Sequence, residues 1–423
     1  MPKSLKISTL AVSAVLLLTM FLGANVFRVH ASGQAQDSAY KQMQVYSEVL
    51  RHIQSDYVVD PNMPKVTDAA MRGLLESLDA ESSYLTPEEY KLYKEHADKP
   101  QAGIGATMGK RYGIAWVVTV VPGGPADKAG LKSNDRIESI GDRSTLDMSL
   151  AEVRLALEGE KGSNVTVSVI RPTKSAPDKL TVTRADVTLP AASEVYYEGG
   201  SILYVKPVTI DKDHVQQVEQ KLKTMSRMNS KKILLDLRDV ATGDPAEAIR
   251  LANLFIKSGT IATLEGQKVD KQTFVAEANK TVNDKAPMVT LVNHGTAGAA
   301  EIVAGALLDS KRSELVGEKT YGDGGQQRMF ILPAGDAVIL TVAKFATPSG
   351  KKYQDDGITP TTAVATAQEL AMADADDEDE DVDTTSTATA NAPKTAVPAA
   401  AKPAADIDDQ LNKALDILKA KAA

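Results

Sequence analysis

The chain has 423 residues, of which 43% are hydrophobic and 25% are charged, and its formal net charge is −8. This length is enough for two or three domains, each with its own core. The acidic balance gives no electrostatic reason to expect binding to nucleic acid. Cysteine is absent, which excludes disulfides, cysteine-based zinc sites and a lipidated N-terminal cysteine.

The N-terminus has the pattern of a targeting segment. Lys3 and Lys6 precede an apolar stretch that runs from Ile7 to about Phe27, and a small-residue cleavage pattern ends at Ala31. The stretch is also close to the ~20 residues that a membrane helix needs, so an uncleaved anchor is the alternative to a signal peptide. Both alternatives predict export to the periplasm or cell envelope.

Apolar residues recur at helical spacing between Tyr46 and Tyr93, which predicts a helical region. Thr86 or Ser83 can cap a new helix there, with Pro87 at its first position.

Residues 101–188 carry an ordered series of motifs. Gly-Ile-Gly-Ala occupies 103–106, an apolar strand pattern follows, and Gly-Pro-Ala-x-x-Ala-Gly-Leu occupies 124–131. Further strand patterns flank a predicted helix at 150–157. This order resembles a PDZ domain, which implies that a peptide adds to a strand edge while loop N–H groups hold its terminal carboxylate. The expected peptide-binding residues are Gly103, Ile104, Gly105, Ala106, Leu150, Val153 and Leu157.

Strands and helices alternate from about 201 to 362. Residues 233–238 and 288–292 read as buried strands, and helical patterns follow at 245–256 and 299–308. This alternation predicts an α/β core with a mainly parallel sheet. Further strands are predicted at 326–332 and 337–346.

Composition changes beyond residue 366. Residues 374–383 are nearly all acidic, and 384–405 are mostly Ala, Thr and Pro, so we expect a disordered linker. Apolar residues from Ile407 to Leu418 then line one face of a final helix. The expected organisation is 1–31 signal peptide or anchor, 40–100 helical region, 101–188 PDZ domain, 189–366 α/β core, 367–405 linker and 406–423 C-terminal helix.

Residues 293–301 read Asn-His-Gly-Thr-Ala-Gly-Ala-Ala-Glu, and 317–324 read Gly-Glu-Lys-Thr-Tyr-Gly-Asp-Gly. These segments resemble the C-terminal processing (tail-specific) serine peptidases, whose motifs are Asn-x-Gly-Ser-Ala-Ser-Ala-Ser-Glu and Gly-Glu-x-Thr-Phe-Gly-Lys-Gly. The resemblance implies a peptidase core of that type, in which a serine attacks and a lysine is the general base. It places Gly298 at the nucleophile position and Asp323 at the base position, while Glu301 and Gln327 are retained.

A third motif also differs from the family pattern. After the strand ending at Arg238 the family carries Gly-Asn-Pro-Gly-Gly, whose backbone contributes to the oxyanion hole. This chain has Asp-Val-Ala-Thr-Gly at 239–243, so only Gly243 remains. Thr242 carries a Cβ where a close backbone approach, with a positive φ, was expected. A serine–lysine peptidase needs a hydroxyl, a neutral amine and backbone donors to the oxyanion, and all three positions have changed.

Three alternatives remain open for the changed site. Thr296 and Lys319 could form a shifted hydroxyl–amine pair that sustains activity. His294 could belong to a serine–histidine site, although no serine or acid partners it in sequence. Asp323 and Glu301 could share a proton or bind a cation, as paired carboxylates do.

The sequence therefore predicts an exported pseudopeptidase that has lost serine–lysine catalysis and binds C-terminal peptide tails. An active relative or a second copy of the chain is a further possible partner. No cofactor or metal is expected. The alternative is an active serine endopeptidase with a rearranged site.

Overall fold

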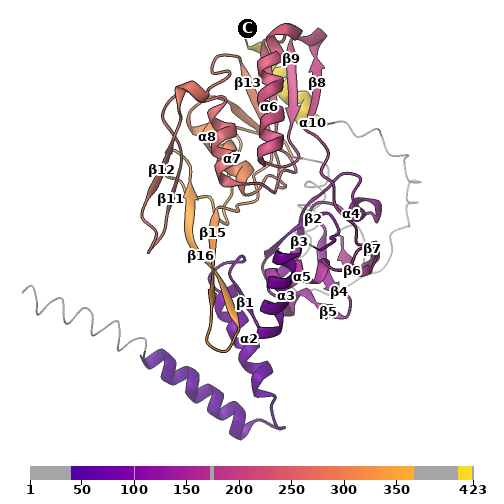
Figure 1. Cartoon of the computed structure of the whole chain (residues 1–423), viewed down its shortest axis with the longest axis vertical. Coiled ribbons are helices and arrows are strands. Elements are labelled where there is room, and N and C mark those ends of the chain that lie inside the picture. Colours follow the sequence, from indigo (N-terminus) through magenta and orange to yellow (C-terminus); the bar gives the residue numbers. More distant parts are fainter. Residues whose placement is uncertain (1–39, 100, 172–175, 366–407, 422–423) are drawn as a thin grey trace, which may run out of the picture. The chain divides into compact units, whose positions relative to one another are not determined.

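The computed structural model describes residues 40–99, 101–171, 176–365 and 408–421 (Figure 1). The predicted leader at 1–31 and the predicted linker at 367–405 lie outside these residues. The chain divides into two compact units, Met1–Ala70 and Met71–Ala423. Within the described ranges, no helix is both long enough and apolar enough to cross a bilayer.

The predicted helical region contains one strand. Residues 40–56 are helical, and α2 (Met63–Glu76) and α3 (Pro87–Asp98) follow. The expected cap of α3 is confirmed: the Thr86 hydroxyl accepts from the Glu89 N–H, and Pro87 opens the helix. The continuous helical reading is wrong at Ser83–Leu85, which forms β1 and pairs antiparallel with β16. All three β1 residues are buried, so their backbone groups need ladder partners there.

The PDZ region is a sheet of order β2-β3-β4-β6-β7, with β5 paired to β4. Its elements are β2 (Ala106–Arg111), β3 (Ile114–Val120), α4 (Pro125–Lys128), β4 (Arg136–Ile140), β5 (Arg143–Ser144), α5 (Leu150–Leu157), β6 (Asn164–Ile170) and β7 (Asp178–Thr183). A Ser149–Glu152 capping box starts α5. Among the described residues β3 is the one strand that forms a ladder with β2, and α5 lies next to β2.

The α/β core is a six-stranded sheet of order β17-β14-β13-β10-β9-β8. Its elements are β8 (Ser193–Tyr197), β9 (Ile202–Lys206), α6 (Lys212–Thr224), β10 (Lys232–Asp236), α7 (Pro245–Asn253), β13 (Met288–Val292), α8 (Ala299–Asp309), β14 (Glu314–Gly317), β17 (Thr362–Ala363) and α10 (Asp409–Ala420). Every pairing is parallel except that of β8 with β9, as the alternation of strands and helices predicted.

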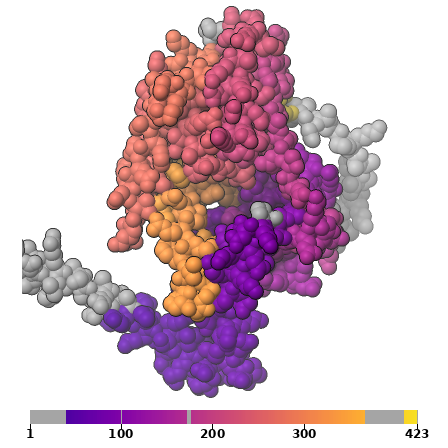
Figure 2. Space-filling model, viewed as in Figure 1, coloured from indigo at the N-terminus to yellow at the C-terminus, as the bar shows by residue number. Residues whose placement is uncertain are grey.

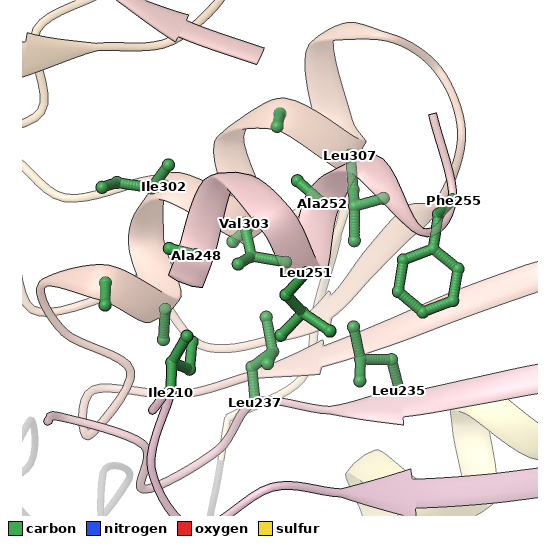
Figure 3. Packing of buried hydrophobic residues seen from close by; sticks show 14 of the residues in the cluster. Ile210, Leu235, Leu237, Ala248, Leu251, Ala252, Phe255, Ile302, Val303 and Leu307 are labelled. Carbon is green, nitrogen blue, oxygen red and sulfur yellow. The ribbon is translucent and has the colours of Figure 1, made fainter. Parts of the chain in front are cut away.

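Successive residues along the buried strands serve opposite faces of this sheet. Leu235 and Leu237 meet α7 and α8 through Leu251, Val303 and other apolar residues (Figure 3). Leu234, the neighbour of Leu235, belongs to the other face, which α10 covers. Each central strand is therefore apolar on both sides, which explains its continuous hydrophobic run.

A second, antiparallel sheet has the order β1-β16-β11-β12, with β15 also paired to β16. Its core strands are β11 (Thr260–Glu265), β12 (Gln272–Val275), β15 (Gly325–Ile331) and β16 (Ala337–Ala346). The strand patterns at 326–332 and 337–346 therefore belong to this sheet and not to the parallel one. In Figure 2 the orange strands β15 and β16 and the purple α3 flank a hollow, to which Gln327, Tyr93 and Arg154 contribute.

Three parallel strands bring the changed motifs to one edge. β10, β13 and β14 end at Asp236, Val292 and Gly317, and each leads directly into one of the segments singled out from sequence. The carboxyl ends of parallel strands are where α/β folds place their functional loops.

Candidate active site

Gly298 occupies the turn between β13 and α8. Its φ of 56° and ψ of −116° lie in a region that residues with a side chain rarely adopt. A Cβ built on Gly298 would meet only one neighbour within 4 Å, the Asp323 Oδ2 at 3.3 Å. The structure thus places the two positions that the resemblance singled out, 298 and 323, next to each other. Neither a hydroxyl nor an amine is present on this pair.

Glu301 holds the two loops together. Its buried carboxylate accepts hydrogen bonds from the N–H groups of Gly298 (3.1 Å), Gly322 (2.8 Å) and Asp323 (2.7 Å). It also accepts from the Thr320 hydroxyl. Burial raises the pKa of Glu301 to about 7, against the effect of these donors, and the Asp323 charge adds to the increase. Glu301 therefore joins the turn that carries Gly298 to the loop that carries Asp323.

The Asp323 carboxyl lies in a largely buried and predominantly acidic environment. Burial is the main cause that raises its pKa to about 7, and the Glu81 carboxylate raises it further while Arg154 opposes the increase. Arg154 binds Glu81 through two hydrogen bonds of 3.1 and 3.2 Å. Asp323 and Glu81 line one cavity of about 330 Å³, with Asp355 and Lys110 on its other walls.

The turn at 239–243, which follows β10, is hydrogen-bonded to the segment that leads into Gly298. The Val240 carbonyl accepts from the Ala297 N–H (3.0 Å), and Asn293 bonds both the backbone N–H and the carboxylate of Asp239. The expectation of a positive φ at Thr242 is wrong: the left-handed residue is Asp239, with φ 60°. Thr242 instead donates its hydroxyl to Thr209 (2.9 Å).

The close backbone approach in this turn falls on Gly243. A Cβ at Gly243 would lie 2.7 Å from both the Cβ and the carbonyl oxygen of Ile210. This close contact leaves no room for a Cβ, which explains why Gly243 is the one glycine of the family motif that this segment keeps.

Thr296 is fully buried, and its hydroxyl has both kinds of partner. It donates to the Leu237 carbonyl (2.8 Å) and accepts from the Asn293 N–H (3.0 Å). Lys319 is exposed. This geometry gives the Thr296–Lys319 pair no support, because the hydroxyl is engaged by the backbone.

His294 packs among other residues of the site rim. Its ring lies 6.2 Å from the Tyr321 ring in an edge arrangement, and Arg111 Nη1 is 3.4 Å from its Nε2. Burial lowers the pKa of His294, and the Arg111 charge adds to this effect. The described residues hold no cluster of three or more His, Cys, Asp or Glu side chains that fits a metal ion.

The PDZ sheet contacts the candidate site directly, which sequence reasoning missed. Arg111 of β2 lies 4.6 Å above the Tyr321 ring and bonds the Tyr321 carbonyl. A Cβ on Gly109 would lie 1.9 Å from the Tyr321 hydroxyl oxygen. Val118 of β3 packs with Ala297 and Tyr321. A glycine inside a strand signals close approach, so Gly109 was the residue that could have revealed this contact.

The expected carboxylate clamp adopts a loop with one left-handed residue. Gly103 pairs with Ala185, Gly105 has φ 74°, and Ala106 begins β2. The carbonyls of Ile104 and Gly105 accept from Ala126 and Val121. Their own N–H groups donate to no other residue in the described part of the chain, which leaves them available to a carboxylate.

The expected apolar groove wall is not open. Leu150, Val153 and Leu157 are 1%, 0% and 4% exposed and belong to the PDZ core. A helix with period 3.6 presents these three positions to one face, and that face packs on the sheet. Arg154 reaches past them to β2, where its Nη2 donates to the Met108 carbonyl (3.2 Å).

Gln327 lies apart from the Asp323 cavity. Its Nε2 donates to the Thr341 hydroxyl (3.1 Å), and it lines the separate hollow beside Arg154 and Leu155. Gln327 therefore has a partner on the neighbouring strand and, among the described residues, no hydrogen bond to Gly298 or Asp323.

The chain resembles known proteins in both domains. Residues 201–364 match the family described as peptidase family S41, and 116–171 match the PDZ domain. The carboxy-terminal processing protease CtpA of Bacillus subtilis is 31% identical over 348 residues, which are 81% of this chain and 73% of that protein. The carboxy-terminal-processing protease of Bartonella bacilliformis is 29% identical and covers 78% and 76%.

A solved structure supports the same assignment. The photosystem II D1 C-terminal processing protease superposes with a TM-score of 0.63 at 26% identity, covering 77% of this chain and 95% of that one. On the sequence match with CtpA and the agreement of both domains, the chain belongs to the C-terminal processing peptidases of peptidase family S41.

Proposed function

We propose that this chain is an exported member of the family that has lost serine–lysine catalysis and acts by binding C-terminal peptide tails. The observation that carries the proposal is the Gly298–Asp323 pair. Gly298, at the position that corresponds to the family's nucleophile, has no side chain, and the group that faces it is the Asp323 carboxylate. In a serine peptidase, loss of one catalytic member lowers turnover by roughly 10⁶, and further losses add little.

The surrounding donors support the same proposal. An oxyanion hole needs N–H groups that are free to face the developing charge. Here the Ala297 N–H is bonded to Val240, and the Gly298 N–H is bonded to Glu301. In the PDZ loop, by contrast, the N–H groups of Ile104 and Gly105 have no backbone acceptor among the described residues.

Peptide titration tests the binding function. Peptides that end in apolar residues are titrated into the full chain, with C-terminally amidated versions as the control for carboxylate recognition. We expect saturable binding that amidation removes. Equal affinity for the two forms, or no binding by any peptide, contradicts the proposal.

A matched pair of glycine variants locates the binding site. Gly105→Ala and Gly123→Ala both place a side chain at a left-handed position, with φ 74° and 72°. Only Gly105 belongs to the clamp, so Gly105→Ala should weaken binding by tenfold or more on the scale of ~1.4 kcal/mol per decade, whereas Gly123→Ala should not. Equal effects would place the peptide elsewhere.

The active alternative predicts a different result. A rearranged peptidase would cleave an unfolded protein with an apolar C-terminus, and Thr296→Ala would abolish that cleavage. We expect no cleavage by either form, because the Thr296 hydroxyl is bonded to the Leu237 carbonyl. Cleavage that depends on Thr296 overturns the proposal.

The partner in such a role is a protein tail, an active relative or a second copy of the chain. Native mass spectrometry of the chain, alone and with an active family member, distinguishes these partners. Export is tested by whether the chain is recovered from the cell envelope or periplasm, and an N-terminus near residue 32 then distinguishes a cleaved signal peptide from a retained anchor.

A further inference from the structure

The C-terminal helix α10 begins beside the point where the core ends. The Gln410 side-chain amide donates to the Val364 carbonyl at 2.9 Å, although residues 366–407 separate the two along the chain. Because the two ends of this connection lie close together, its length does not determine where α10 docks. The docking must therefore be set by the contacts of α10 itself.

These contacts are of two kinds. The apolar face of α10 covers the sheet, and this cover consists of Ala414, Leu415 and Leu418 against Ile202, Leu234, Val289, Leu291 and Val316. Apolar packing of this kind is non-directional and lies along the length of the strands. The second kind is polar and occurs at both ends of α10. At the C-terminal end Lys232 donates to the carbonyls of Leu418 and Lys421 (2.7 Å each), whereas the first turn contacts the two site loops.

Asp408, the N-cap of α10, binds Arg238. Two hydrogen bonds of 2.8 and 2.9 Å join the carboxylate to the guanidinium, which also binds Asp236. Burial alone would raise the pKa of Asp408, but the Arg238 guanidinium holds it below its usual value. Arg238 is the residue directly before the altered turn at 239–243. Asp408 therefore fixes one end of that turn with a charge-assisted, bidentate contact.

Gln410 reaches the second loop of the site. Its side chain is 2% exposed and packs on Gly317, where a Cβ would lie 3.5 Å from the Gln410 Cδ. Its Nε2 is 3.3 Å from the Glu318 carboxylate, and its Oε1 accepts from Arg238 Nη1 at 3.2 Å. Gly317 and Glu318 begin the loop that carries Asp323.

We infer that the first turn of α10 is a clamp that positions the two site loops relative to each other, with Asp408 and Gln410 as its positioning residues. The apolar face and the bonds from Lys232 to the C-terminal end hold α10 on the sheet, and the polar first turn positions the loops. This inference does not depend on whether the site is catalytic or on whether the PDZ domain binds peptides.

Hydrogen exchange of full-length variants tests the clamp. Asp408→Asn keeps a good N-cap residue but removes the charge on Arg238. We expect exchange in 238–243 to accelerate about tenfold, as for loss of one charge-assisted contact, while 414–418 stays protected. Gln410→Ala should accelerate 317–324 in the same way. Asp409→Asn is the control: it removes a negative charge from the neighbouring, exposed side chain and should change hydrogen exchange in neither loop.

A variant of the apolar face of α10 distinguishes positioning of the two loops from packing of the helix on the sheet. Leu415→Ala should loosen 414–418 without selective exchange in the two loops. The inference is wrong if Asp408→Asn and Gln410→Ala leave both loops protected, or if they loosen α10 and the loops to the same extent as Leu415→Ala.

Discussion

The carboxylate of Asp323 lies 3.3 Å from the position that a Cβ on Gly298 would occupy. The two residues come from different loops, and Glu301 bonds the backbone of both. The two loops therefore bring positions 298 and 323 together, and this pair carries neither a hydroxyl nor an amine. This relationship determines how the site should respond to substitution.

Restoring the two family side chains should not restore activity. We expect the Gly298→Ser/Asp323→Lys double variant to fold and to remain without measurable turnover of an unfolded protein substrate. A lysine at 323 would share the cavity with the Glu81 and Asp355 carboxylates, which favour its charged form, whereas a general base must be neutral. The turn at 239–243, whose backbone contributes to the oxyanion hole in the family, would also keep its altered sequence.

The control for this experiment must show that the double variant is folded. Serine at a φ of 56° carries strain of about 1–3 kcal/mol, so thermal unfolding must show that the double variant is native at the assay temperature. Robust turnover by a native double variant would mean that the oxyanion hole had survived.

Glu301→Gln should be strongly destabilising. The carboxylate accepts from three backbone N–H groups and one hydroxyl, and an amide would turn an NH₂ group toward some of these donors. We expect a loss of about 2–4 kcal/mol in the free energy of unfolding, measured in urea. Glu265→Gln, at an exposed position of β11, is the matched control and should stay within about 0.5 kcal/mol. Equal effects of the two changes would contradict a bracing role.

The family resemblance paired the Gly298 and Asp323 positions, and in the structure the loops that carry them follow the neighbouring parallel strands β13 and β14. The helix after Gly298 was predicted to start at Ala299, and α8 does start there. Glu81 and Arg154 could not have been placed beside Asp323 in the same way. They come from distant segments, and no local pattern marks a long-range electrostatic neighbour.

Other misses have an equally local cause. The helical spacing of Leu150, Val153 and Leu157 is the same for a groove wall and for a core-facing helix, so periodicity could not separate the two. The strand Ser83–Leu85 is too short to show alternation, and it exists because β16 offers a partner. Motif comparison put the positive φ on Thr242, whereas the fold puts it on Asp239.

Asp323 should make the protein less stable as pH rises. Its pKa in the folded state is raised to about 7 from an ordinary value of 3.8, so the folded state binds the proton more tightly than the unfolded state. The resulting stabilisation is complete below about pH 4 and is lost as pH rises toward and through 7. Asp323→Asn should remove this dependence and be more stable than the parent at pH 8 by about 1–3 kcal/mol.

Urea unfolding of both proteins between pH 4 and 8 measures the difference. Glu301 titrates in the same window, and the Asp323 charge contributes to its raised pKa, so the difference between the two curves also contains the part of the Glu301 titration that depends on Asp323. Parallel curves for the parent and Asp323→Asn would show that the Asp323 carboxyl is solvated in the folded state.

Gly109→Ala should disturb the contact between the PDZ sheet and the base loop. Its Cβ would lie 1.9 Å from the Tyr321 hydroxyl oxygen and 2.6 Å from the Cζ, and Arg111 holds the same ring from above. Because the tyrosine cannot move without giving up this stacking, we expect a loss of about 1–3 kcal/mol and faster hydrogen exchange in 320–324. Gly73→Ala, in α2 with no atom within 4 Å of the new Cβ, should be neutral or stabilising by about 0.5–1 kcal/mol. If Gly109→Ala behaves like Gly73→Ala, the Tyr321 ring does not rest on β2 in solution, and the PDZ domain is free of the base loop.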